Sequence, residues 1–276
     1  MSAGAPFEGA RPAEGGRAPG HHPSEDAATI VLRVERIAKS FGGVHALRDV
    51  SFTIARGERV ALIGPNGAGK TTCFNVIDGQ LAPDRGQVLL DGARTDGLPP
   101  RAVAARGVGR TFQVAATFAS MTVRENVAVA IAARDGRDGA CIGSLARRTD
   151  ELNALLARLD LAALADAHCA SLAYGDAKRV ELALALARQP LLLLMDEPTA
   201  GAGAAARDTV MRIVADIVRD GSAAVLFTEH DMDVVFAHAD RVIVLDRGVI
   251  IAMDTPAAIR ADPRVQAAYL GTPVSP

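Results

Sequence analysis

The sequence predicts an α/β fold with a parallel-sheet core, and two observations carry that prediction. Residues 59–63 form a short apolar run that is followed by a glycine-rich loop and a helix-favouring stretch. After Pro190 apolar strand-like runs alternate again with helix-like segments, which is the order of a parallel sheet connected by helices. Two earlier runs, 30–34 and 50–55, are separated by turn residues and predict an additional antiparallel β subdomain.

Composition narrows the class of protein. The chain has 276 residues, 49% of them hydrophobic, enough to bury the core of one large or two modest domains. Its net charge of −2 gives no basic field for nucleic acid, so we expect no nucleic-acid partner. The 3 cysteines have unrelated spacings, which predicts neither a disulfide framework nor a zinc site and favours a reducing cytoplasm. No run reaches the roughly 18 apolar residues of a membrane-spanning helix.

The chain divides into a leader, a folded region and a tail. Residues 1–28 are rich in Gly, Ala, Pro and charge and are predicted to be a disordered leader. The folded domain is expected to span 29–272, with 273–276 as a tail. Within it, about 114–180 switches to helix-favouring sequence with a glycine-rich break, which predicts a helical subdomain inserted in the core. Strands and helices are predicted to alternate afterwards at 191–195, 208–219, 223–228, 231–238 and 242–245.

The glycine-rich loop after the first core strand predicts a phosphate-binding site. Gly64 and Gly69 let the backbone wrap so that successive N–H groups face phosphate oxygens. Lys70 adds a positive charge for the β and γ phosphates, and the Thr71 hydroxyl can ligate Mg²⁺. The alternative is a chance glycine turn, which the preceding strand and the following helix disfavour. The residues predicted to bind a nucleoside triphosphate here are Gly64, Pro65, Asn66, Gly67, Ala68, Gly69, Lys70, Thr71 and Thr72.

Two adjacent carboxylates follow the apolar run 191–195. In an open parallel sheet ligands sit at the carboxyl ends of the strands, so Asp196 and Glu197 are expected beside the phosphate loop. The chain bends at the end of a strand, which allows the two side chains different roles. Asp196 is predicted to hold Mg²⁺ through water, and Glu197 to reach the attacking water as a general base. The alternative is a solvated acidic turn after a core strand.

Three further motifs follow in order along the chain. Phe112-Gln113 lies beyond the phosphate loop, Leu172-Ala173-Tyr174-Gly175-Asp176 opens a helix, and Thr228-Glu229-His230-Asp231 ends a later strand. With the phosphate loop and the acidic pair, they resemble the ATP-binding cassette (ABC) family of ATPases over roughly residues 30–272. The resemblance implies a P-loop nucleoside triphosphatase fold with a parallel-sheet core, an antiparallel β subdomain and an inserted helical subdomain. It also implies ATP hydrolysis with Mg²⁺.

The resemblance assigns further site residues. Gln113 would contact Mg²⁺ or the attacking water and link the site to the helical subdomain. His230 would hydrogen-bond the γ phosphate, because a neutral imidazole can donate from one nitrogen and accept at the other. Phe41 would stack on adenine, although phenylalanine is also ordinary core material. The signature segment would use its helix N-terminus to bind ATP held by a second cassette. Its predicted nucleotide-binding residues are Leu172, Ala173, Tyr174 and Gly175.

Part of the sequence resembles the ABC subgroup that powers branched-chain amino acid uptake in bacteria. The matching segments are Arg110-Thr111-Phe112-Gln113 and the ending from Thr255 through Gly271. This implies an importer subunit, peripheral on the cytoplasmic face of the inner membrane. Its partners would be two transmembrane permease subunits, a second ABC ATPase subunit and, indirectly, a solute-binding protein. The competing interpretation is a soluble mechanochemical ATPase acting on DNA or ribosomes, but the interval from Gln113 to Leu172 lacks the sustained heptads of their coiled coils.

Three positions depart from the usual sequence of the family. Ala173 stands where the signature usually has serine, and Tyr174 stands where it has glycine. After Pro198, the loop that usually carries Asp or Asn has Gly203. The loss of two polar side chains predicts that one composite ATP site is slower than the other. We therefore expect an asymmetric heterodimer, with a homodimer as the alternative.

Overall fold

Two sheets and several layers of helices make up the part of the chain that the structure describes. The computed structural model describes residues 30–111, 117–134 and 145–270. The predicted leader 1–28, the tail 273–276 and Gln113 lie outside these ranges. The described residues form one largely parallel sheet, one antiparallel sheet and helices packed on them, which confirms the predicted α/β class.

The antiparallel sheet comes from the first third of the chain. Its strands are β1 (Ile30–Phe41), β2 (Val44–Ala55), β4 (Arg85–Leu90) and β5 (Ala93–Arg94), in the order β2-β1-β4-β5. The two predicted runs pair directly, with Ile30 opposite Ala55 and Val34 opposite Phe52. Alternate residues of the second run are buried, as expected where one face of a sheet covers a core. This is the predicted antiparallel addition.

The second sheet holds the carboxyl ends at which the candidate site lies. Its strands are β3 (Arg59–Ile63), β6 (Val108–Thr111), β7 (Leu192–Asp196), β8 (Ala224–Thr228), β9 (Arg241–Asp246) and β10 (Val249–Asp254), in the order β10-β9-β3-β8-β7-β6. β10 is antiparallel to β9, and the other strands are parallel. Sequence reasoning missed β6, because a four-residue edge strand containing Gly109 and Arg110 has no apolar pattern of its own.

The parallel strands are buried on both faces, which explains their continuous apolar text. Leu192 and Leu194 belong to one hydrophobic core, shared with the antiparallel sheet and with α1 (Lys70–Ile77). Leu193 and Met195 face a second core, formed with the helices on the other side. The two cores fix the orientation of β7 and therefore the direction in which Asp196 leaves its end.

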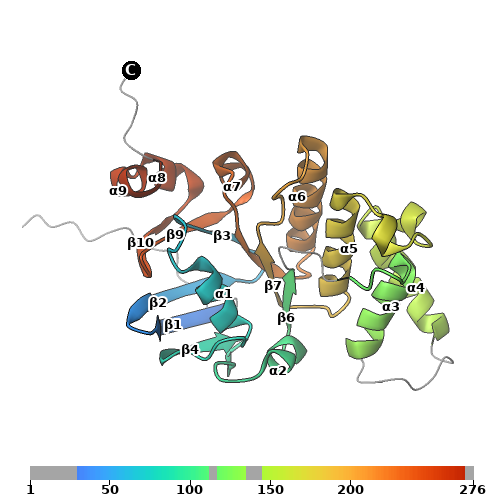
Figure 1. Cartoon of the computed structure of the whole chain (residues 1–276), viewed down its shortest axis with the longest axis horizontal. Helices are drawn as coiled ribbons and strands as arrows, with labels where there is room; N and C mark the ends of the chain where they lie inside the picture. The colour runs from blue at the N-terminus through green and yellow to red at the C-terminus, as the bar shows by residue number, and fades with distance from the viewer. Residues whose placement is uncertain (1–29, 112–116, 135–144, 271–276) are drawn as a thin grey trace, which may run out of the picture.

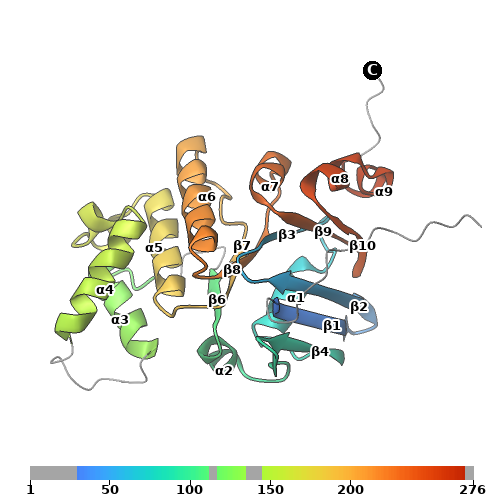
Figure 2. The same cartoon turned by 180° about the vertical axis from the view of Figure 1, so that it is seen from behind.

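Of the remaining helices, α2 (Pro100–Ala105) adds Val103 to the first core, and the others cover the second core or lie beside it. These others are α3 (Val123–Arg134), α4 (Leu145–Arg158), α5 (Tyr174–Leu186), α6 (Ala204–Arg219), α7 (Met232–His238), α8 (Pro256–Ala261) and α9 (Pro263–Val265), with short helical turns η3 (Ala162–Leu164), η4 (Cys169–Ser171) and η5 (Gln266–Leu270). Figures 1 and 2 show α3, α4 and α5 gathered at one end of the molecule, far from β1 and β2. None of the described helices is long and apolar enough to cross a membrane.

The helices at that end pack through apolar stripes. Buried residues of α4 recur at Leu152 and Leu156, with Leu159 just after the helix, which is the spacing of one helical face. They join a hydrophobic cluster with Val127 and Ile131 of α3. α3 also contacts α5, and α5 contacts β6 and α6 of the core. These elements fall in or at the edge of the predicted segment 114–180, so the helical insertion is linked to the sheet through α5.

Candidate functional site

A pocket of about 210 Å³ lies at the carboxyl ends of the central parallel strands. It brings together the loop after β3, the acidic residues after β7 and the histidine after β8. Ala46 of β2 contributes from the antiparallel sheet. The predicted residues that line it are Asn66, Gly67, Ala68, Gly69, Lys70, Thr71, Thr72, Asp196, Glu197 and His230.

The loop between β3 and α1 is wrapped tightly against its neighbours. A Cβ atom on Gly64 would lie 2.0 Å from the backbone oxygen of Leu245, and one on Gly69 would lie 2.4 Å from that of Ala46. Gly69 also has a φ of 109°, a conformation that residues with a side chain rarely adopt. Both glycines are therefore required by close backbone approach, in agreement with the tight wrapping predicted from the sequence.

The N-terminus of α1 presents donors to this pocket. The helix has no side-chain cap, and its first intrahelical bond runs from the Cys73 N–H to the Gly69 oxygen at 2.9 Å. The N–H groups of Lys70, Thr71 and Thr72 precede that bond and lie at the positive end of the helix dipole. An anion in the pocket would meet these groups, as the phosphate prediction requires.

Lys70 reaches across the mouth of the same loop. Its Nζ donates to the backbone oxygens of Gly64 at 2.6 Å and Pro65 at 3.2 Å. Burial lowers the pKa of Lys70, while the charges of Glu197 and Asp196 act in the opposite direction. A partly desolvated ammonium held by two carbonyls is in position to bind phosphate oxygens.

The two carboxylates diverge at the end of β7. Asp196 Oδ1 accepts a hydrogen bond of 2.7 Å from the hydroxyl of Thr228, its register partner on β8. Glu197 has a φ of 49°, so the chain turns sharply after the strand. Its N–H donates to the backbone and hydroxyl oxygens of Thr228 at 3.2 and 3.1 Å, which holds this turn. The predicted bend is present, and it separates the directions of the two side chains.

Glu197 and His230 are in direct contact. The Nε2 atom of His230 lies 2.8 Å from Glu197 Oε1, although the residues are 33 positions apart in the chain. The loop that carries His230 is held on both sides: the buried Glu229 accepts hydrogen bonds from Thr199, and Asp231 caps α7 while pairing with Arg207. Burial raises the pKa of Glu229. The imidazole itself is half exposed and faces the pocket.

The predicted adenine and signature residues lie apart from this pocket. Phe41 ends β1 with an exposed ring, and Lys39 Nζ lies 5.6 Å from the ring centroid. Tyr174 starts α5, is 48% exposed, and donates a hydrogen bond of 2.7 Å to the oxygen of Ala200. Ala173 is the N-cap of α5 and provides no side-chain cap. Leu172 and Gly175 flank these two residues, so the signature segment does not line its own chain's phosphate loop.

Comparison with known proteins decides the family. Residues 47–200 match the model described as ABC transporter. The high-affinity branched-chain amino acid transport ATP-binding protein LivG of Salmonella typhimurium is 37% identical over 249 residues, covering 87% of this chain and 98% of that protein. This chain belongs to the ABC transporter family. Its cassette is an ATP-binding ATPase, as the sequence predicted.

Further matches show which ABC cassettes this chain is similar to. Residues 249–275 match a second model, described as Branched-chain amino acid ATP-binding cassette transporter. The lipopolysaccharide export system ATP-binding protein LptB of Escherichia coli K12 is 35% identical over 240 residues, covering 87% of this chain and 97% of that protein. The crystal structure of MJ1267, an ATP-binding cassette of an ABC transporter in its ADP conformation, superposes with a TM-score of 0.76 at 31% identity, covering 88% of this chain and 99% of that one. ABC cassettes dimerise and work with transmembrane permease subunits.

The donors in the cassette's pocket suit Mg²⁺. Thr71 and Asp196 both line it and offer hydroxyl and carboxylate oxygens, which are the ligands that Mg²⁺ prefers. Among the described residues no group of three or more His, Cys, Asp or Glu could hold a metal alone.

Sequence reasoning missed residues that hold the ABC site without lining it. Thr228 and Glu229 precede His230 in its motif, but the sequence predicted no role for either residue. A hydroxyl at the end of the neighbouring strand could have indicated Thr228, since parallel strands end at the same edge of a sheet. No sequence pattern indicated that Thr199 would hydrogen-bond Glu229, because that contact depends on how the loops carrying these residues fold.

Proposed function

We propose that this chain is the ATP-hydrolysing subunit of a bacterial ABC importer for branched-chain or related amino acids. The observation that carries the proposal is the match of residues 249–275 to the branched-chain amino acid cassette model. The match to LivG along nearly its whole length supports it. ATP hydrolysis in the nucleotide pocket powers transport, and other subunits recognise the solute.

The chemistry that we propose is in-line attack of water on the γ phosphate. Glu197 is the general base, and Lys70 with the first N–H groups of α1 stabilises the charge that develops on the phosphate oxygens. Mg²⁺ held by Thr71, by Asp196 through water and by Gln113 would neutralise charge on the β and γ phosphates. The remaining phosphate-loop residues, Gly64 to Ala68 and Thr72, cradle the triphosphate through their backbones.

His230 controls access to the base in this scheme. Its Nε2 atom lies 2.8 Å from Glu197 Oε1, the oxygen that a water molecule would need. When His230 turns to donate to the γ phosphate, it leaves that oxygen for the water. Binding of ATP thereby frees the Glu197 carboxylate to act as the base, whereas in the empty site this carboxylate stays paired with His230.

The proposed assembly is supported by the exposed N-terminus of the signature helix. The N-terminus of α5 has no side-chain cap and lies outside its own pocket, so it is available to the nucleotide of a second cassette. Leu172 to Gly175 would contact that nucleotide, and Phe41 the adenine of its own. Gly203, the N-cap of α6, also lacks a side-chain cap. With Ala173, it supports a heterodimer with unequal sites, on two permease subunits at the cytoplasmic face of the inner membrane.

A second candidate function is an export ATPase, because the match to LptB is nearly as strong as that to LivG. The experiment that separates the two isolates the tagged chain from detergent-solubilised native membranes and identifies its partners by mass spectrometry. If the chain belongs to an importer, two permease subunits and a second cassette should co-purify with it. In vesicles reconstituted with this complex, the rate of ATP hydrolysis should rise when a solute-binding protein loaded with a branched-chain amino acid is added. Co-purification with lipopolysaccharide-export components, and no response to amino acids, would overturn the importer and leave the ATPase intact.

A further inference from the structure

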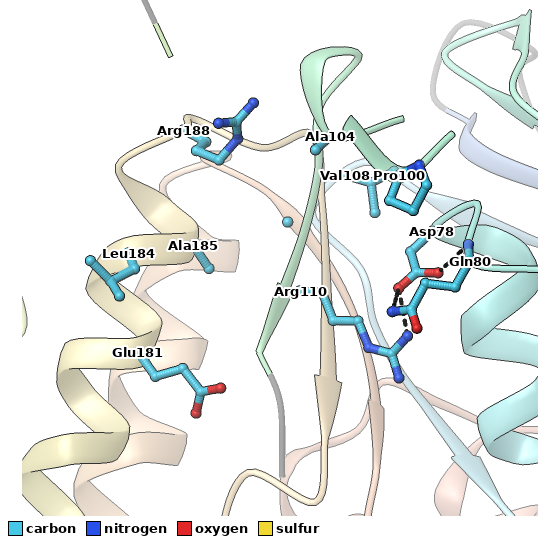
Figure 3. A pocket seen from close by; sticks show the side chains of 11 residues that line it. Asp78, Gln80, Pro100, Ala104, Val108, Arg110, Glu181, Leu184, Ala185 and Arg188 are labelled. Carbon is cyan, nitrogen blue, oxygen red and sulfur yellow. Dashed lines mark hydrogen bonds and ion pairs between the residues drawn. The ribbon is translucent and has the colours of Figure 1, made fainter. Parts of the chain in front are cut away.

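Arg110 connects two parts of the nucleotide site that the sequence treats separately. It lies on β6, and its side chain is only 9% exposed. Its guanidinium nitrogen Nη1 donates to Asn75 Oδ1 at 2.7 Å and to Asp78 Oδ2 at 2.5 Å, and Nη2 lies 3.6 Å from Asp196 Oδ2. Figure 3 shows the guanidinium turned toward Asp78 and Gln80, away from Glu181 of α5. One side chain therefore spans from α1 to the end of β7.

The anchor on α1 is itself fixed. Asp78 is the C-cap residue of the helix, and its two carboxylate oxygens accept from the backbone N–H of Gln80 at 3.1 Å and from the Gln80 side chain at 2.8 Å. The guanidinium also lies over the buried ring of Phe74, with 5.7 Å between its carbon and the centroid. Arg110 thus grips the last turns of α1 at three residues.

The other end of the contact is the carboxylate proposed to hold Mg²⁺. Asp196 Oδ1 accepts from the Thr228 hydroxyl, while Oδ2 faces Arg110. Neighbouring strands therefore approach both oxygens, β8 from one side and β6 from the other. Rotation of the carboxylate would weaken one of these contacts, so the pair sets its orientation.

The same side chain also connects the two elements that carry the proposed metal ligands. Thr71 stands in the first turn of α1, and Arg110 holds the last turns of that helix against the strand that ends in Asp196. A helix is stiff over two turns, so a constraint at one end is felt at the other. Lysine could not replace this arrangement, because its single ammonium lacks the planar fork that can serve several acceptors in fixed directions.

We propose that Arg110 is a positioning residue for the Mg²⁺ site: it ties the helix that carries Thr71 to the strand that carries Asp196 and orients the Asp196 carboxylate. The inference rests on the proposed function only in taking Thr71 and Asp196 as the Mg²⁺ ligands. It concerns how tightly the metal binds with ATP, independent of which solute is transported.

The test compares Arg110→Lys with Arg106→Lys, a matched change at the exposed turn before β6, where Arg106 Nη1 contacts the Arg94 oxygen. Binding of a fluorescent ATP analogue is titrated first in EDTA and then with increasing Mg²⁺. We expect Arg110→Lys to bind the analogue within twofold of wild type in EDTA, and to need about tenfold more Mg²⁺ to reach the metal-dependent affinity. Arg106→Lys should match wild type in both titrations.

The outcomes separate the two proposals. If Arg110→Lys is folded and its Mg²⁺ titration coincides with that of wild type, the positioning role is wrong, whatever the transporter carries. If Arg110→Lys does not fold, Asp78→Asn decides, since it weakens the anchor on α1 and leaves Arg110 and Asp196 in place. A Mg²⁺ requirement raised severalfold in Asp78→Asn supports the proposal, and an unchanged one overturns it. Failure of the wild-type chain to bind the analogue would instead refute the proposed nucleotide site.

Discussion

Thr228 holds the Asp196 carboxylate, and its hydroxyl can be removed with little change in shape. The side chain is 1% exposed and donates to Asp196 Oδ1 at 2.7 Å. Thr228→Val replaces that hydroxyl by a methyl group. The N–H of Glu197 keeps its bond to the Thr228 backbone oxygen at 3.2 Å, so the substitution leaves no orphaned donor there.

The magnitude follows from the kind of hydrogen bond that is lost. A hydrogen bond to a charged group contributes about 1.5–3 kcal/mol, so Thr228→Val should lower the free energy of unfolding by about 2 kcal/mol. If the same loss is felt in the transition state, where Asp196 must be oriented, kcat falls by up to about thirtyfold. The control is Thr228→Ser, which keeps the hydroxyl and loses one buried methyl, about 1 kcal/mol of stability.

The assay measures urea denaturation and steady-state ATP hydrolysis for wild type and both variants. We expect Thr228→Val to lose rate as well as stability, with a fall in kcat of about tenfold to thirtyfold. Thr228→Ser should lose only stability. A Thr228→Val protein that hydrolyses ATP within twofold of wild type would refute the reasoning, as would an equal loss of rate in Thr228→Ser, because the hydroxyl would then not be the group that matters.

Three further variants test other parts of the site. Ala173→Ser supplies an N-cap hydroxyl to α5 and should raise the free energy of unfolding by about 1 kcal/mol in urea titrations; no gain would mean that the cap is not formed. Burial raises the pKa of Glu229 above its ordinary value of 4.5, so the stability that this residue contributes is present below pH 4.5 and is lost as pH rises through the folded pKa. Glu229→Gln should remove this pH dependence and, in denaturation curves measured from pH 4 to 8, should be relatively more stable than wild type at neutral pH. Parallel pH dependences of stability for the two proteins would contradict this expectation. Glu197→Gln should bind ATP normally and lose kcat by about a hundredfold or more, trapping the dimer; unchanged hydrolysis would exclude Glu197 as the base.

The local chemistry of the phosphate loop was readable from the sequence. A strand, two required glycines, Lys70 and a helix start follow one another in a few residues, so no distant part of the chain is needed to interpret them. The acidic pair was readable for a related reason, because the continuous apolar run 191–195 before it is typical of a buried parallel strand, and ligands lie at the carboxyl ends of such strands. The structure brings both to one pocket with His230.

Contacts between distant segments were not readable. The Glu197–His230 contact depends on a left-handed turn at a glutamate, which no residue preference announces. The hydrogen bond from Tyr174 to Ala200 joins the signature helix to a loop 26 residues later. From the sequence, Tyr174 was only a departure from the usual glycine. Phe41 and the signature segment lie outside the pocket, so their proposed contacts depend on bound nucleotide and on a second cassette.

The sequence by itself determined the α/β class and the order of the motifs, and it predicted the residues of a nucleotide site, because these depend on short-range patterns of apolar, glycine and charged residues. Only the tertiary structure decided how the site is held. Strand order sets β6 and β8 on either side of β7, and that neighbourhood alone lets Arg110 and Thr228 orient the two oxygens of Asp196. Sheet order is fixed by the packing of two cores over the whole chain, so it is not contained in any local stretch of sequence.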